Sequence, residues 1–197
     1  MRVCFDYEIF WKQSFSGVAS RYYYNLINCL AASGKIDLKV FAGFYINEKL
    51  ASLSKDKISG VKIKRKIPFT GKVFEKLNSS FCNYKISQFK PNIIHKTYYN
   101  NDIKKNKSKI VLTVFDLWHE KNSNFKILPK KKSIELADHI LCPSNKTKKD
   151  LVDIYKVSES KITVTYFGIE NFSYTSNHNL EVKMDKPYIL FVGSRGR

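Results

Sequence analysis

The stretch from Ile110 to Glu120 constrains the fold of this chain more than any other. It opens with an uncharged run rich in β-branched side chains and continues into Asp116, His119 and Glu120. An apolar run of this kind predicts a strand that is buried on both faces, as in parallel sheets. Because open α/β sheets bind ligands beyond the carboxyl ends of their strands, the polar side chains that follow indicate a binding site.

The rest of the chain alternates between strand and helix patterns. Residues 2–6 and 38–42 are typical of strands, and residues 18–30 between them have a wide apolar stripe at helical spacing that ends near Gly34. Residues 7–17 are expected to form a loop. Strand, helix and strand in this order make a βαβ unit, whose strands pair in parallel.

Further elements follow the same alternation. We expect a short helical segment at 50–53, strands at 61–64, 91–95, 139–142 and 162–167, and helices at 72–89, 125–137 and 144–155. The pattern predicts an α/β fold with a doubly wound, mainly parallel sheet. Residues 1–170 are assigned to this domain, the polar segment 171–186 to a linker, and residues 187–197 to the first strand of a second domain.

The charge balance is strongly basic, with 35 Lys and Arg against 17 Asp and Glu, which gives a net charge of +18. Such a surplus favours an anionic partner, either nucleic acid, a phosphate-bearing ligand or an anionic membrane. The alternative is a lysine-rich composition on a solvated surface. No run of 18 apolar residues and no signal-peptide pattern occur, so we expect a cytoplasmic protein.

The cysteines and histidines do not form metal-ligand patterns. The four cysteines are far apart and contain no CxxC pair, which favours small buried side chains such as Cys4, Cys29 and Cys142 in a reducing compartment. The four histidines are too scattered to indicate a metal site. We expect neither a metal ion nor a cofactor.

Three groups of residues could bind a ligand. Ser16 and Gly17 lead into a helix, whose N-terminal N–H groups can bind an anion, although a plain turn is the commoner use of one glycine. Arg21 lies one turn further on, either to reach a phosphate or to face solvent. Asp116, His119 and Glu120 suit acid–base or hydrogen-bonding work, unless they are only a loop with an Asp cap and a surface histidine. Near the end of the chain, a glycine turn with an arginine suits a diphosphate, and its residues are Gly193, Ser194 and Arg195.

Seven segments in collinear order resemble the GT4-type glycosyltransferases, which have the GT-B fold. These segments are residues 2–6, 15–22, 91–99, 112–120, 137–144, 161–169 and 187–195, so the resemblance extends over nearly the whole length of the chain. The resemblance implies two Rossmann-like domains facing each other across a cleft, with the acceptor on the N-terminal domain and the nucleotide-sugar on the C-terminal one. Residues 1–170 would then be the acceptor domain.

The resemblance also implies roles for the candidate residues. Gly17 and its neighbours would meet the donor diphosphate or the acceptor, and Asp116 and His119 would line the cleft as tentative catalytic residues. Phe115 and Glu120 would flank the transferred sugar, and Arg195, with Gly193 and Ser194, would bind the donor phosphate.

Three features depart from the family pattern. Ser16 replaces the first of two adjacent glycines, and Phe115 replaces a histidine that commonly precedes the aspartate. The chain also stops where the second domain would begin, before the lysine and paired glutamates that hold the nucleotide-sugar.

The expected function is therefore transfer of a sugar from a nucleotide-sugar to a saccharide or lipid-linked acceptor. By resemblance, the reaction would be retaining and metal-independent and would belong to surface polysaccharide or lipopolysaccharide biosynthesis. The basic charge balance would in addition suit peripheral attachment to the anionic inner face of the membrane. One alternative is a truncated acceptor domain without turnover of its own. A nucleic-acid-binding module is a remote alternative that rests on charge alone, and we expect no nucleic-acid partner.

Overall fold

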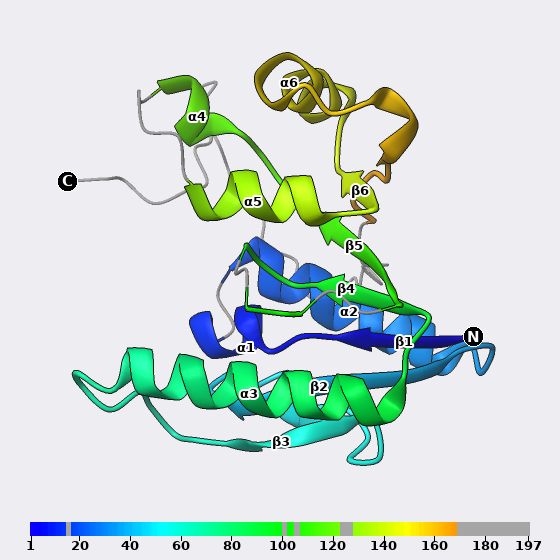
Figure 1. Ribbon diagram of the computed structural model, residues 1–197. Helices are drawn as coiled ribbons and strands as arrows, with labels where there is room; N and C mark the ends of the chain where they lie inside the picture. Colours follow the sequence, from blue (N-terminus) through cyan, green and yellow to red (C-terminus); the bar gives the residue numbers. More distant parts are fainter. Residues whose placement is uncertain (15–16, 100–101, 105–106, 123–127, 169–197) are drawn as a thin grey trace, which may run out of the picture. The chain divides into compact units, whose positions relative to one another are not determined.

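A computed structural model describes residues 1–14, 17–99, 102–104, 107–122 and 128–168. Its centre is a seven-stranded sheet of order β3-β2-β1-β4-β5-β6-β7, in which each neighbouring pair is parallel (Figure 1). The strands are β1 (Arg2–Phe5), β2 (Asp37–Tyr45), β3 (Ile58–Lys62), β4 (Ile93–Lys96), β5 (Lys109–Thr113), β6 (His139–Cys142) and β7 (Ile162–Val164). The fold is α/β and Rossmann-like, as the sequence predicts.

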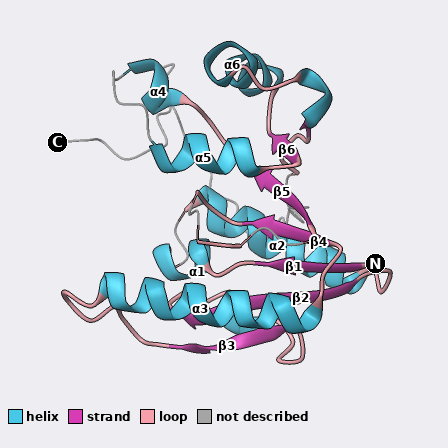
Figure 2. Cartoon of the chain, viewed as in Figure 1, coloured by secondary structure: helices cyan, strands magenta, loops and turns pink. Residues whose placement is uncertain are grey.

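Helices connect the strands (Figure 2). They are α1 (Glu8–Lys12), α2 (Val18–Ala32), α3 (Gly71–Phe89), α4 (Trp118–Asn122), α5 (Leu128–Leu136) and α6 (Asn145–Tyr155), with 3₁₀ turns at Leu50–Ser52 and Glu159–Lys161. Gly34 ends α2 at a φ of +64°, and the Ser144 hydroxyl caps α6 by accepting from the Thr147 N–H at 3.1 Å. Both ends were predicted from the sequence.

The alternation of side chains along β1 divides the core between the two faces of the sheet. Phe5 packs with Tyr23 and Ile27 of α2 on one face. Cys4, the residue before it, packs with Cys82 and Ile86 of α3 on the other. A third apolar cluster joins β5 and β6 to α5 and α6. Helices α2 and α3 therefore cover opposite faces of the sheet, and the central strands are buried on both sides.

The strand β5 lies between β4 and β6, where the long apolar run placed it. Ile110 and Leu112 are buried, and Val111 is half-buried. Ile110 is paired with Ile94 of β4, and Leu112 with Ile140 of β6. The prediction of an interior strand at this position is confirmed.

An asparagine fixes α3 on the sheet. β2 has an irregularity between Phe41 and Gly43, and Gly43 adopts a φ of +56°, which glycine tolerates best. The buried side chain of Asn78 accepts from the Phe44 N–H at 2.7 Å and donates to the Phe44 carbonyl at 2.9 Å. A Cβ atom on Gly43 would collide with the Asn78 amide, so the glycine makes room for this pair of hydrogen bonds.

The structure corrects several expectations. Residues 8–12 form α1 rather than a loop, and its Ile9, Phe10 and Trp11 are all buried, so the segment lacks the amphipathic pattern of a surface helix. The stripe of α2 is narrower than expected because Val18 and Cys29 are exposed. β7 ends at Val164, three residues earlier than expected.

The first compact unit spans Met1–Phe167. The expected linker at 171–186 and the last strand at 187–197 lie outside the described residues. Within the part of the chain that the structure describes, no helix has the length and apolar character needed to cross a bilayer.

Candidate functional site

A cavity of about 850 Å³ lies beyond the carboxyl ends of three neighbouring strands. Its wall includes Glu8 after β1, Tyr98 and Tyr99 after β4, and Phe115 and Asp116 after β5. β1 and β4 are neighbours in the sheet, and the order of the strands reverses between them. Open α/β sheets bind ligands at such a reversal.

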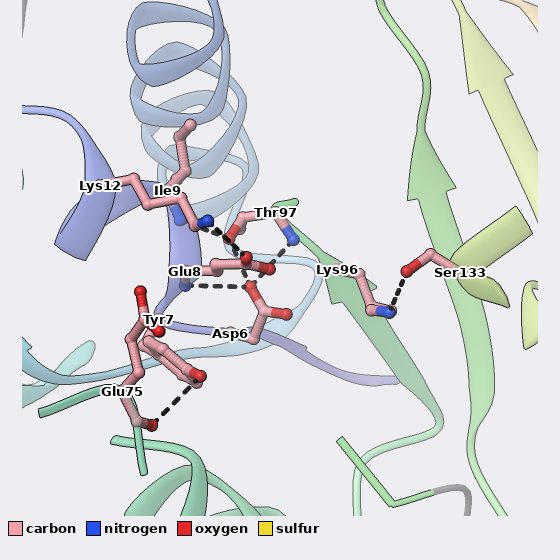
Figure 3. A network of polar contacts seen from close by, with 9 residues as sticks. All are labelled: Asp6, Tyr7, Glu8, Ile9, Lys12, Glu75, Lys96, Thr97 and Ser133. Carbon is pink, nitrogen blue, oxygen red and sulfur yellow. Dashed lines mark hydrogen bonds and ion pairs between the residues drawn. The ribbon is translucent and has the colours of Figure 1, made fainter. Parts of the chain in front are cut away.

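A buried carboxylate connects two of these strand ends (Figure 3). Asp6, fully buried, accepts hydrogen bonds from the Thr97 N–H at 2.9 Å and from the Thr97 hydroxyl. Its Oδ1 also accepts from the Glu8 N–H at 3.4 Å. The Thr97 hydroxyl in turn accepts from the Ile9 N–H at 3.1 Å. The start of α1 is therefore held to the ends of β1 and β4.

Burial and the neighbouring groups shift the pKa of Asp6 in opposite directions. Burial raises the pKa of Asp6, and the hydrogen bonds from Thr97 and the charge of Lys96 only partly offset it. Burial likewise lowers the pKa of Lys96, against the pull of Asp6, Glu8 and Asp102. The Lys96 ammonium donates to the Ser133 hydroxyl at 2.9 Å (Figure 3), which connects β4 to α5.

The helix α1 supplies a carboxylate and an amine to the cavity wall. Glu8 and Lys12 are one helical turn apart and form an ion pair of 3.3 Å. Lys12 Nζ also lies 4.8 Å from the centre of the Tyr98 ring, a cation–π distance. The wall here combines charged and aromatic groups that can each contact a polar ligand.

The opposite wall is held by a buried ion pair. Lys130 Nζ lies 3.0 Å from Glu120 Oε1 and donates to the Asp116 carbonyl at 2.8 Å. Tyr155 donates from its hydroxyl to Glu120 at 3.1 Å. Lys130 lines the cavity and lies 5.0 Å from the centre of the Tyr99 ring. Glu120, predicted to flank the sugar, is not among the described lining residues, and its side chain is 2% exposed.

Asp116 and His119 both line the cavity and both are exposed. The Asp116 carboxylate accepts from the Trp118 N–H at 3.1 Å, where α4 begins. The Asp116 carboxylate therefore holds the turn into α4, and it also lines the cavity. The His119 ring lies edge-on to Trp118, with centroids 5.1 Å apart.

Phe115 belongs to an aromatic cluster on the same wall. It stacks on Phe167, with centroids 5.9 Å apart, and contacts Tyr22 and Tyr23 edge-on. A histidine at this position would bring a polar ring into the cluster. The cavity wall is therefore apolar where the family pattern commonly has a histidine.

Gly17 forms the N-cap of α2, with extended backbone at φ −90°. A Cβ atom there would collide with the side-chain amide of Gln13, which lines the cavity. The glycine thus leaves room for the Gln13 side chain, and its backbone conformation is one that any residue can adopt. Arg21 is exposed and is not among the described lining residues. Ser16, Gly193, Ser194 and Arg195 lie outside the described residues.

His95 is buried beneath the cavity wall. It stacks on Phe5, with ring centroids 5.0 Å apart, and its Nε2 lies 2.9 Å from the Thr113 hydroxyl. Burial lowers the pKa of His95 to about 3. The ring is therefore neutral at physiological pH and serves the packing between β1, β4 and α2.

Sequence reasoning missed Asp6, Lys96, Thr97 and Lys130. The first three follow or end strands β1 and β4, so the rule that singled out Asp116 after β5 also applied to them. Lys130 carried no such signal, because it is one lysine among many in a basic chain. Among the described residues, no group of three His, Cys, Asp or Glu side chains could hold a metal ion.

Comparisons with known proteins agree with this geometry. The model of Glycosyltransferase Family 4 matches residues 18–171. The apo structure of the lipopolysaccharide outer core galactosyltransferase WaaB shares 18% identity at a TM-score of 0.57, and the match covers 86% of this chain and 46% of that one. A glycosyltransferase from Rickettsia africae ESF-5 shares 18% identity at a TM-score of 0.51, covering 89% and 47%.

At this identity the two structures show a shared fold, and the chain spans about half the length of each. A comparison with curated protein sequences found no match. The family model covers more than half of the 197 residues. The chain therefore belongs to Glycosyltransferase Family 4.

Proposed function

We propose that the chain acts in the transfer of a sugar from a nucleotide-sugar to a saccharide or lipid-linked acceptor, and that the cavity binds the acceptor. The observation that carries this proposal is the lining of the cavity at the reversal of strand order. Three carboxylates, Glu8, Asp102 and Asp116, line it, and carboxylates accept hydrogen bonds from hydroxyl groups. The rings of Tyr98 and Phe115 offer apolar faces to a sugar ring.

In this proposal Asp116 and His119 contact the reacting sugars from the acceptor side. The N-terminal N–H groups of α2, beside Gly17, contribute partial positive charge toward the leaving diphosphate. Arg195, with Gly193 and Ser194, supplies further donors to the same phosphates. Such a reaction depends on positioning and electrostatic stabilisation, without a metal or cofactor. Retention at the anomeric carbon follows from the family resemblance.

The pathway proposal rests on the activity of one structural neighbour. WaaB is a lipopolysaccharide outer core galactosyltransferase, and we extend this class of pathway, surface polysaccharide or lipopolysaccharide synthesis, to the present chain. The acceptors of such pathways are bound to membranes. We therefore propose a cytoplasmic protein that attaches to the anionic inner face of the membrane, which the net charge of +18 favours.

A second proposal is that these 197 residues bind the acceptor without turnover of their own. It is favoured by one observation, that the chain spans about half the length of the glycosyltransferase structures it matches. Transfer requires both substrates to be held together.

The two proposals are separated by one pair of measurements on the purified chain. Release of free nucleotide from a panel of nucleotide-sugars is followed with and without short oligosaccharide acceptors, and binding of the same oligosaccharides is followed by NMR. Acceptor-dependent release supports the transferase, and binding without release supports the acceptor unit. If the oligosaccharides neither bind nor promote release, the acceptor assignment of the cavity is wrong.

The matched variants for the binding measurement are Asp116→Asn and Asp153→Asn. Asp116 lines the cavity, whereas Asp153 borders a separate shallow depression on α6. We expect Asp116→Asn to weaken oligosaccharide binding about tenfold, since a hydrogen bond to a charged group contributes about 1.5–3 kcal/mol. Asp153→Asn should leave the affinity unchanged.

A further inference from the structure

The segment from Val61 to Leu77 exposes an unusual number of apolar side chains. It comprises the end of β3, a loop and the first two turns of α3, and we call it the loop–helix surface. Its exposed apolar residues are Val61, Ile67, Phe69, Val73 and Leu77, and Phe69 is fully exposed. Scattered apolar residues on a surface need no explanation, but five within one short segment indicate an interaction site.

The same segment is strongly basic. It holds six cations, Lys62, Lys64, Arg65, Lys66, Lys72 and Lys76, against the single carboxylate of Glu75. Every one of these cations except Arg65 is a lysine, and all six are exposed. Apolar side chains interleaved with lysines form the kind of surface that binds the interface of an anionic bilayer.

The backbone presents Phe69 to solvent at a conformational cost. Phe69 has a φ of +64°, a region that bulky side chains rarely occupy. The turn around it is held by the Thr70 hydroxyl, which donates to the Ile67 carbonyl at 2.8 Å. Backbone strain of this kind persists at sites where a side chain must be presented.

The loop–helix surface is attached to the wall of the acceptor cavity through Trp11. Phe74 of α3 stacks on the Trp11 ring with centroids 5.3 Å apart, and Lys66 Nζ lies 5.1 Å from its centre. Trp11 belongs to α1, whose Glu8 and Lys12 line the cavity. In Figure 1 the loop between β3 and α3 projects at the same edge of the sheet as α1. A membrane on this surface would therefore lie on the side of the sheet where α1 lines the cavity.

From these observations we infer that the loop–helix surface docks on an anionic lipid bilayer, with Ile67 and Phe69 entering the interface and the surrounding lysines contacting lipid phosphates. This inference rests on the membrane attachment proposed above and names the surface responsible for it. An anionic bilayer fits better than an acidic protein, because the fully exposed Phe69 and the partly exposed Ile67 stand on a turn rather than in a groove. Insertion of such a turn needs a deformable apolar partner.

The test is sedimentation of the 197-residue chain with vesicles made of equal parts phosphatidylglycerol and phosphatidylcholine, at low salt. We expect the chain to sediment with these vesicles and to remain in solution with pure phosphatidylcholine. The double variant Ile67→Ser with Phe69→Ser should lower the partition constant at least about tenfold, which follows from the apolar area no longer inserted. Both side chains are exposed, so the fold should survive, and circular dichroism checks this.

Matched variants separate the surface from general charge and general hydrophobicity. Tyr84→Ser removes an exposed ring from α3, about 10 Å beyond Leu77 along the helix axis at the helical rise, and should bind like the unchanged protein. Lys64→Glu with Arg65→Glu should lower binding at least about 25-fold, at about fivefold for each cation lost. Lys35→Glu with Lys55→Glu, which changes the net charge equally, should have a much smaller effect.

The docking inference is wrong if the Ile67 and Phe69 variant sediments as well as the unchanged protein, or if the two charge variants lose binding equally. It is also wrong if the chain ignores vesicles and binds a single-stranded oligonucleotide instead. Sugar transfer is measured separately with a soluble acceptor. If the chain sediments with vesicles but transfers no sugar, the docking inference stands and the transferase proposal is wrong. If it transfers sugar but does not sediment, only the docking inference is wrong.

Discussion

Asp6 receives both the backbone N–H and the hydroxyl of Thr97, so one buried carboxylate joins the carboxyl ends of β1 and β4. The same threonine hydroxyl holds the Ile9 N–H at the start of α1. The position of α1, and with it the Glu8 and Lys12 side chains of the cavity, depends on this pair. Asp6 and Thr97 are 91 residues apart in the sequence.

Removing the Asp6 carboxylate should destabilise the fold. In Asp6→Ala the Thr97 N–H, the Thr97 hydroxyl and the Glu8 N–H all lose their acceptor in a buried setting, and we expect a loss of about 3 kcal/mol in the free energy of unfolding. Urea unfolding measures it. Asp37→Ala, which changes an exposed aspartate at the start of β2, serves as the control and should cost less than about 0.5 kcal/mol. Equal losses in the two variants would contradict the role given to Asp6.

His95 should make the stability of the protein depend on pH. Its pKa in the folded chain is about 3, below the ordinary value of 6.5. A depressed pKa contributes stability that is complete above the unfolded value and is lost as the pH falls from about 6.5 toward 3, by up to about 5 kcal/mol. The measurement is urea unfolding between pH 7 and pH 4 for the unchanged protein and for His95→Gln. The difference between the two proteins should shrink on acidification, and a constant difference would show that His95 does not titrate in this way.

Loss of the lysine should cost much more stability in the buried pair of Lys130 and Glu120 than in an exposed pair on α5. Lys130→Met leaves the Glu120 carboxylate without its cation, and we expect a loss of about 3–5 kcal/mol, of which Glu120→Gln in the same chain should recover a large part. The control pair is Lys131 and Glu135, which is exposed with 3.7 Å between its charged atoms. Lys131→Met should cost less than about 0.5 kcal/mol. Equal costs at the two lysines would rule out the buried ion pair.

Gly17→Ala should alter the cavity more than the stability. The added methyl group meets the flexible amide of Gln13, which can move, so the free energy of unfolding should change by less than about 1 kcal/mol. The displaced amide enters the cavity that Gln13 lines, and oligosaccharide affinity measured by NMR should fall. Gln13→Ala combined with Gly17→Ala should restore the affinity. If the double variant binds no better than Gly17→Ala, the clash with Gln13 is not the cause.

The sequence predicted the sheet well because each strand signals itself locally. The run at Ile110 marked an interior strand without any knowledge of its neighbours. Helix α1 left no such mark, because Ile9, Phe10 and Trp11 are buried on all sides and show no period. A short helix of this kind is recognisable only once the elements that cover it are known.

The site was harder to predict than the fold, for a different reason. Asp6 and Thr97 are important because β1 and β4 are neighbours, and adjacency of strands distant in sequence is a property of the topology. The pairing of Lys130 with Glu120 is equally hidden, since Lys130 looks like an ordinary surface charge in a basic chain. Asp116 and His119 were found because they follow the most distinctive strand of the sequence.

The side chain of Asn78 holds the main chain at Phe44 from the middle of α3. A roll or slide of the helix along β2 would therefore break these two hydrogen bonds. Its outward residues can consequently be substituted while its inner contacts stay the same. If the proposed docking surface binds lipid, its lipid preference can therefore be altered without disturbing the cavity that we propose binds the acceptor.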